Sequence, residues 1–236
     1  MFSGWTRVAI GGKPADVFDP PHSLPFALLY LHPESGETPA TDSSFTSELR
    51  TRRLRCIAPH APLSWWVDRI CTEFDTQLTA EHHLRDNVVP WIESTWKLGK
   101  RSVGVAGTGM GGQGAVRLGF KYPERFPVVA SIAGAFDFHE RYGQGTPLDG
   151  MYSSREQCRQ DTAILHIPPH DCPQIWFACS PGDAWYRGND RLHEKLAALG
   201  IPHTAELDGA VRDDRPIASM LAFVFASIER ESRRLT

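Results

Sequence analysis

The stretch GTGMGGQGA, residues 107–115, lies between an apolar run and a helical pattern that ends near Tyr122. Glycine-rich turns from strand to helix occur in two kinds of protein. One is the dinucleotide-binding fold, whose G-x-G-x-x-G fingerprint is matched by Gly107, Gly109 and Gly112, with Asp137 ending the next apolar run where a ribose-binding carboxylate belongs. That fingerprint belongs to the first strand–helix–strand unit, whereas several strand-like runs precede it here.

The same residues fit the nucleophile elbow G-x-S-x-G. In an elbow the chain turns sharply, and small flanking residues let neighbouring backbone approach the nucleophile. Gly107 and Gly111 occupy the two flanking positions, and Gly109 stands where the serine belongs. Because glycine has no side chain, an elbow built from this sequence lacks its nucleophile.

The rest of the chain predicts a mostly parallel, doubly wound α/β sheet with an N-terminal antiparallel hairpin, in one domain over residues 1–236. Apolar runs of strand length alternate with helical patterns, as expected where helices cover both faces of a sheet. The hairpin strands are Thr6–Ile10 and Ala15–Phe18. The expected inner strands are Phe26–Leu31, Leu54–Ala58, Val103–Ala106, Val128–Ile132, Ile175–Cys179 and His203–Leu207, and the expected helices are Thr79–Trp96, Gly112–Tyr122, Asp190–Leu199 and Pro216–Arg233.

The run MGGQGA at 110–115, followed by KYPERF at 121–126, resembles the Putative esterase family of the α/β-hydrolase superfamily. This family includes esterase D (S-formylglutathione hydrolase), feruloyl esterases and mycolyltransferases, and its pattern is G-x-S-M-G-G-x-G-A before K-Y-P-[DE]-x-F. The resemblance extends over most of the chain, through Leu29–His32, Ala58-Pro59, Val88–Glu93 and Ser180–Asp183. It implies an α/β-hydrolase fold of the esterase type.

The resemblance assigns Asp183 to the acid position and Gly109 to the nucleophile position. Val211 marks the approximate place of the catalytic histidine, but no histidine follows His203 in the chain. Met110 retains the N–H that follows the nucleophile in the oxyanion hole. In the family a glycine usually follows the histidine of the oxyanion loop, whereas Pro33 follows His32 here and has no N–H to donate.

Two other histidines lie near the end of the chain, and neither is expected to reach the elbow. His193 falls in the middle of a predicted helix, and His203 begins a strand at the opposite end of the sheet. Two of three triad positions are therefore empty.

Aromatic and charged residues after one strand suggest a ligand site. Trp65 and Trp66, with Asp68 and Arg69 beside them, could stack on a planar or sugar-like ligand. The alternative is that this loop folds back as structural packing. The predicted ligand-binding set also includes Trp185, just beyond the acid position, and His32.

Composition excludes several classes of function. A net charge of −3 and a pI near 6.4 give no footprint for nucleic acid or an anionic membrane. No apolar run approaches the roughly 18 residues that span a bilayer, and the N-terminus lacks a signal-peptide pattern. Five cysteines without framework spacing predict a reducing, cytoplasmic location. No metal-ligand motif is present and no cofactor is expected, while a homo-oligomer stays open.

Three functional hypotheses follow. The leading one is a catalytically inactive esterase homologue, a pseudoenzyme that binds a small molecule, such as an ester-like compound, or a protein partner. The second is an active carboxylic-ester hydrolase with a displaced nucleophile or base. The third is a nucleotide-binding protein that uses the Gly107–Gly112 loop.

Overall fold

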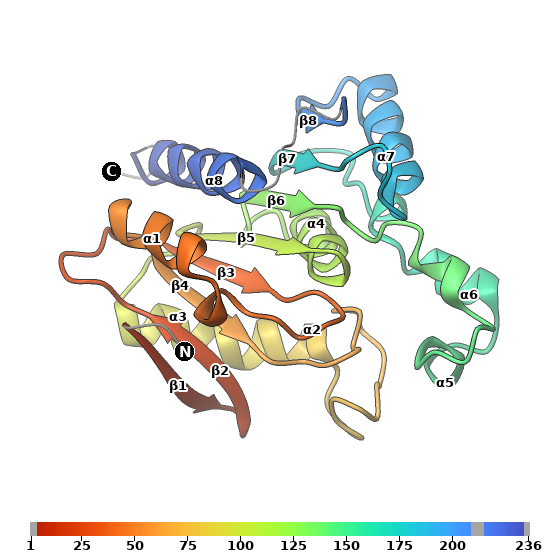
Figure 1. Ribbon diagram of the computed structural model, residues 1–236, viewed down its shortest axis with the longest axis horizontal. Coiled ribbons are helices and arrows are strands. Elements are labelled where there is room, and N and C mark those ends of the chain that lie inside the picture. The colour runs from red at the N-terminus through yellow and green to blue at the C-terminus, as the bar shows by residue number, and fades with distance from the viewer. Residues whose placement is uncertain (1–3, 209–214, 234–236) are drawn as a thin grey trace.

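The strands form one mixed eight-stranded sheet in the computed structural model, which describes residues 4–208 and 215–233. The strand order is β1-β2-β4-β3-β5-β6-β7-β8 (Figure 1). The β1–β2 hairpin joins the sheet through an antiparallel β2–β4 pairing, and every pairing from β4 to β8 is parallel. The strands are β1 Trp5–Ile10, β2 Lys13–Phe18, β3 Ala27–Leu31, β4 Arg55–Pro59, β5 Val103–Thr108, β6 Val128–Ile132, β7 Gln174–Ala178 and β8 Thr204–Glu206. The predicted fold class is confirmed.

Helices cover both faces of this sheet (Figure 1). The longer helices are α1 Ser43–Thr51, α3 Val89–Trp96, α4 Met110–Lys121, α7 Tyr186–Ala198 and α8 Arg215–Arg233. Short segments connect them: η1 Pro39–Thr41, α2 Ala80–His83, η2 Leu84–Val88, η3 Phe138–Arg141, α5 Leu148–Met151, α6 Arg155–Gln160 and η4 Ala163–Leu165. Among the described residues, no helix has the length and the hydropathy needed to cross a lipid bilayer.

Successive side chains of β3 point to opposite faces of the sheet and pack against different helices. Leu28 and Tyr30 pack against α1 and α8, while Leu29 and Leu31 pack on the side of α3 and α4. All of them are buried. A central parallel strand is apolar on both faces for this reason, which is why the sequence predicted its position so well.

Two helices differ from their predicted form. The predicted helix Thr79–Trp96 is divided into α2, η2 and α3, with a π-helical turn in which the N–H of Val89 donates to the carbonyl of Leu84. Pro90 follows at once and has no N–H, so the regular helical pattern cannot continue through it. Helix α1 was given no predicted range because its pattern is weakly apolar, although the arginines at its end were expected on a helix that leads into a strand. The Asp42 carboxylate caps this helix by accepting the N–H of Phe45.

The elbow helix α4 lies unusually close to its neighbours, and glycines make this possible. A Cβ on Gly111 would lie 1.9 Å from the carbonyl oxygen of Leu31, and one on Gly114 would lie 2.4 Å from Cβ of Trp66. Real Cβ atoms do not approach backbone or side chains so closely. These glycines therefore fix the start of α4 against β3, and with it the geometry of the elbow.

A buried ionic network holds the other end of the same helix. Arg117 is 1% exposed and pairs with Glu81 on α2 and with Asp161 after α6. Its Nε also donates to the carbonyl of Asp161 at 2.9 Å. Burial alone would favour the neutral acids. The pKa of Glu81 is nevertheless held below its ordinary value by Arg117 and Lys121, and that of Asp161 by His166 and Arg117, so both carboxyl groups are ionised.

Replacing Arg117 with alanine should remove about 3–5 kcal/mol from the free energy of unfolding, because two buried carboxylates would lose their main counter-ion. Urea denaturation at neutral pH measures this loss. Arg159→Ala serves as the control, since Arg159 pairs with Glu156 in solvent and should change stability by no more than about 0.5 kcal/mol. Equal stability of the two variants would show that the buried network contributes little.

Candidate active site

Gly109 keeps the backbone geometry of a sharp strand-to-helix turn. It lies between β5 and α4 with φ 55° and ψ −120°, a conformation that favours glycine. Its N–H donates to the carbonyl of Ile132 at 3.0 Å, and its own carbonyl accepts from Ala135 at 2.9 Å and from Gln113 at 3.1 Å. The elbow is thus fully bonded and correctly shaped, although the side chain that would react is absent.

A carboxylate from another loop occupies this elbow. Oε2 of Glu34 accepts the backbone N–H of Met110 at 3.0 Å. The same oxygen would lie only 2.6 Å from a Cβ on Gly109, so a side chain at position 109 would require Glu34 to shift. Gly109 therefore makes room for the carboxylate, and the donor predicted to serve an oxyanion is already used.

Glu34 is a site residue that was not predicted from the sequence. It follows His32 by two residues in the loop after β3, which the parallel sheet brings to the carboxyl end of β5. An acidic side chain near the start of a helix is stabilised by the helix dipole, as Glu34 is at the start of α4. The one sequence feature that pointed to Glu34 was its place in the oxyanion loop. No known motif relates the spacing of residues 34 and 110, so the contact itself could not be predicted.

Asp183 lies after β7, at the same end of the sheet as the elbow, as the acid position requires. Its Oδ1 accepts the backbone N–H of Trp185 at 2.8 Å. No histidine of the described residues forms a hydrogen bond or ion pair with it. His193 and His203 instead bond to each other, with 2.8 Å between their ring nitrogens. The prediction for Val211 lies outside the described residues.

His32 is a buried structural residue. Its Nε2 accepts the N–H of Ala61 at 2.9 Å, and its Nδ1 lies 2.7 Å from the carbonyl of Pro33. Burial lowers the pKa of this imidazole to about 4, so it is neutral and Nδ1–H donates to Pro33. Both ring nitrogens are engaged, so the role that the structure gives His32 is to shape the loop that carries Glu34.

The two tryptophans are packed inside the protein. Trp65 is 4% exposed and stacks on Phe138 with ring centroids 5.1 Å apart, and Trp66 is fully buried with its indole N–H donating to the carbonyl of His32 at 3.1 Å. Ligand stacking on these rings stays a prediction, and their burial favours the packing alternative. Trp185 is partly exposed and meets Trp65 edge to face at 6.3 Å.

The charged neighbours of the tryptophans also make internal contacts. Asp68 accepts the hydroxyl of Thr79 at 2.9 Å, and Arg69 pairs with Asp161 at 3.3 Å. Both side chains thereby connect the loop to α2 and to the segment after α6. Across residues 4–208 and 215–233, no three His, Cys, Asp or Glu side chains converge as metal ligands.

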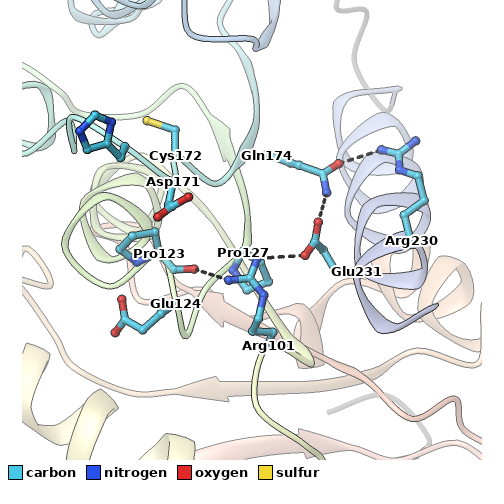
Figure 2. A pocket seen from close by; sticks show the side chains of 10 residues that line it. Arg101, Pro123, Glu124, Pro127, Asp171, Cys172, Gln174, Arg230 and Glu231 are labelled. Atoms are coloured by element: carbon cyan, nitrogen blue, oxygen red, sulfur yellow. Dashed lines mark hydrogen bonds and ion pairs between the residues drawn. The ribbon is translucent and has the colours of Figure 1, made fainter. Parts of the chain in front are cut away.

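Two cavities lie at opposite ends of the sheet. One of about 440 Å³ adjoins the elbow and is lined by Tyr30, Pro33 and Thr108 among others. Another of about 480 Å³ lies where β5, β6 and β7 begin, far from the elbow; Figure 2 shows Arg101 and Gln174 both bonded to Glu231 there. These bonds tie α8 to the sheet, so the second cavity is bounded by structural contacts.

Removing the Glu34 carboxylate should destabilise the protein modestly. Glu34→Ala leaves the first N–H of α4 without its acceptor and removes a negative charge from the helix N-terminus, at a cost of about 1 kcal/mol in the free energy of unfolding. Urea denaturation measures it. Glu37→Ala is the matched control, because Glu37 belongs to the same loop and its carboxylate accepts a hydrogen bond from the hydroxyl of Ser35 rather than from the elbow. An equal effect of both substitutions would argue against the elbow contact.

His32 should make stability depend on pH in the weakly acidic range. Because its pKa is about 4 in the folded protein and ordinarily 6.5, folding favours the neutral form. This contribution is complete above pH 6.5 and is lost as the pH falls toward 4, by about 2 kcal/mol between pH 7 and 5. Denaturation of the unmodified protein and of His32→Asn at both pH values tests it. The stability of His32→Asn should not fall by this amount between pH 7 and 5. An identical pH dependence of the two proteins would show that His32 does not cause the loss of stability.

Comparisons with known proteins agree with this geometry. A family model described as Putative esterase matches residues 62–205, while a comparison with curated proteins finds no match. Among solved structures, an S-formylglutathione hydrolase from Agrobacterium tumefaciens is 15% identical with a TM-score of 0.76, over 98% of this chain and 97% of that one. The substrate-bound serine hydrolase FphF of Staphylococcus aureus is 14% identical with a TM-score of 0.74, over 94% and 97%. MPT51 (FbpC1) of Mycobacterium tuberculosis is 15% identical with a TM-score of 0.74, over 96% and 100%.

At these identities the solved structures show the fold, and the family match carries the assignment. It spans more than half of the chain, from the loop after β4 to β8, and includes both the elbow and the acid loop. The chain belongs to the Putative esterase family, with the α/β-hydrolase fold.

Proposed function

We propose that this chain is a non-hydrolytic member of its family, which binds a small ligand at the elbow end of the sheet. The observation that carries the proposal is the Glu34 carboxylate on the N–H of Met110, in the space beside Gly109. A serine hydrolase needs a nucleophile at 109 and a free N–H at 110. Here the first is absent and the second is already bonded.

The remaining parts of the machinery support the same conclusion. Pro33 supplies no second oxyanion donor, and Asp183 accepts from backbone instead of orienting a histidine. A serine hydrolase stripped of its triad still accelerates hydrolysis about 10³–10⁴-fold, through the oxyanion hole and substrate binding. Because the Glu34 carboxylate already occupies the oxyanion site here, even this residual rate acceleration should be lost.

A second candidate function has one observation in its favour, since an oxygen of the Glu34 carboxylate lies 2.6 Å from the place of a Cβ at position 109. Glu34 could attack an ester carbonyl carbon through one oxygen, forming a mixed anhydride and expelling an alkoxide that takes a proton from water. A second water would then hydrolyse the anhydride and regenerate the carboxylate. We rank this lower, because the N–H that would stabilise the intermediate is bonded to Glu34 itself.

The nucleotide-binding hypothesis finds no support in the loop that suggested it. A Cβ on Gly112 would lie 2.4 Å from the hydroxyl of Ser131, and one on Gly107 would lie 2.4 Å from the backbone of Gly111. These glycines are needed for internal packing of the elbow. The glycine that a pyrophosphate would approach in such a loop is the second one, Gly109, and the Glu34 carboxylate already accepts the neighbouring N–H of Met110.

The purified protein should hydrolyse p-nitrophenyl acetate and butyrate no faster than Gly109→Ala or buffer. The two proteins share every surface nucleophile, so their difference isolates the elbow. Glu34→Gln is run beside them to separate the two candidates. Turnover well above Gly109→Ala that disappears in Glu34→Gln would establish the carboxylate mechanism, and turnover retained in Glu34→Gln would point to another nucleophile.

Restoring the serine should not restore activity. In Gly109→Ser the new hydroxyl has no base to activate it, and it competes with Glu34 for the elbow. The double variant Gly109→Ser, Glu34→Ala removes that competition and should also stay inactive, as judged by the same assay and by labelling with a fluorophosphonate. Vigorous hydrolysis by either variant would show that a base within reach has been overlooked.

A further inference from the structure

An arginine and a tryptophan form a clamp beside the acid loop. The guanidinium carbon of Arg141 lies 5.3 Å from the ring centroid of Trp185. Arg141 ends η3, in the segment after β6, and Trp185 directly precedes α7, two residues beyond Asp183. The clamp therefore joins the two loops that follow neighbouring strands at the elbow end of the sheet.

Arg141 differs from the arginines around it because it has no acidic partner within the described residues. Arg191 pairs with Asp137 at 2.9 Å, and Arg187 lies 4.0 Å from Glu140. Stacking on an indole orients a guanidinium without using its N–H donors. The charge of Arg141 is therefore held in place and left uncompensated.

The clamp borders a cavity of about 230 Å³. Its lining residues are Asp137, Glu140, Arg141, Gln144, Ala184, Trp185 and Arg187. Asp137 pairs through Oδ1 with Arg191, which lies outside the lining, and Glu140 lies 4.0 Å from Arg187. The exposed Arg141 is therefore the arginine of the lining that has no acidic partner among the described residues. Asp183 is not part of the lining. The cavity is smaller than typical drug-sized sites, which start near about 300 Å³.

We propose that the Arg141–Trp185 clamp recognises the carboxylate of a small aromatic acid. The carboxylate would take two N–H donors of Arg141 in the planar, bidentate geometry that guanidinium groups favour. The ring of the acid would lie against Trp185 and Ala184, the apolar part of the lining. This inference names the ligand class for the binding role proposed above and rests on that role, but it does not depend on the loss of hydrolysis.

Calorimetric titration with sodium benzoate tests the clamp. The unmodified protein should show saturable binding with a Kd of about 1 mM or tighter, and neutral benzamide should not bind. Arg141→Ala should weaken benzoate binding about tenfold or more, because a charge-assisted bidentate pair is lost. Arg141→Lys keeps the charge but not the planar guanidinium, so its affinity for benzoate should lie between those of the unmodified protein and Arg141→Ala.

Arg155→Ala is the control for net charge, since Arg155 is exposed on α6 and does not line the cavity. It should bind benzoate as the unmodified protein does. No binding at roughly 10 mM, or equal binding by Arg141→Ala, would overturn the inference. The ester assay tests the proposed lack of hydrolysis independently of the binding experiment. If the protein hydrolyses esters and also binds benzoate through Arg141, the non-hydrolytic proposal is wrong and the proposed benzoate site still stands.

Discussion

The contact between the Glu34 carboxylate and the N–H of Met110 is the constraint on which the account of this site depends. It exists because three features coincide: a helix that begins at Met110, an oxyanion loop that carries an acid, and a glycine at 109. A Cβ at 109 would lie within 2.6 Å of the carboxylate oxygen. Gly109 therefore does more than omit the serine side chain, because it leaves room for the Glu34 carboxylate at the elbow. In an active esterase the same place accommodates the oxyanion that forms during the reaction.

The scaffold around this contact is held in place by close packing and by buried hydrogen bonds. Gly111 and Gly114 let α4 lie against β3 and Trp66, and Arg117 anchors its far turns through Glu81 and Asp161. His32 shapes the loop that presents Glu34 by bonding through both ring nitrogens. A fold that keeps these contacts can still hold a ligand pocket at the carboxyl ends of its strands, which is why binding is the function we propose.

The sequence predicted the sheet well because its central strands are apolar on both faces and its elbow has a fixed pattern of glycines. It predicted the empty position at 109 for the same reason. Glu34 escaped prediction because its partner is 76 residues away in the chain, and only the parallel pairing of β3 and β5 brings the two together. The helix before β5 was predicted as one piece because hydrophobic periodicity does not reveal the π-helical turn at Leu84–Val88, which precedes Pro90.

The tryptophans show a different limit. Asp68 and Arg69 suggested a ligand-binding loop, but these partly exposed side chains bond to Thr79 and Asp161, and the tryptophan rings beside them are buried. A polar residue in sequence does not reveal whether its partner is water or protein. Arg141 was not among the predicted site residues, since its stacking on Trp185 joins two loops and the two residues are 44 positions apart in the chain.

The amide resonance of Met110 reports directly on whether the Glu34 carboxylate accepts the elbow N–H. Nuclear magnetic resonance spectra of the ¹⁵N-labelled protein at neutral pH would be compared with those of Glu34→Ala and Glu37→Ala. The account predicts a large upfield shift of the Met110 amide proton in Glu34→Ala, as its charged acceptor is removed, and no such shift in Glu37→Ala. An unchanged Met110 resonance in Glu34→Ala would show that the elbow donor is free, and the proposed block of the oxyanion site would be wrong.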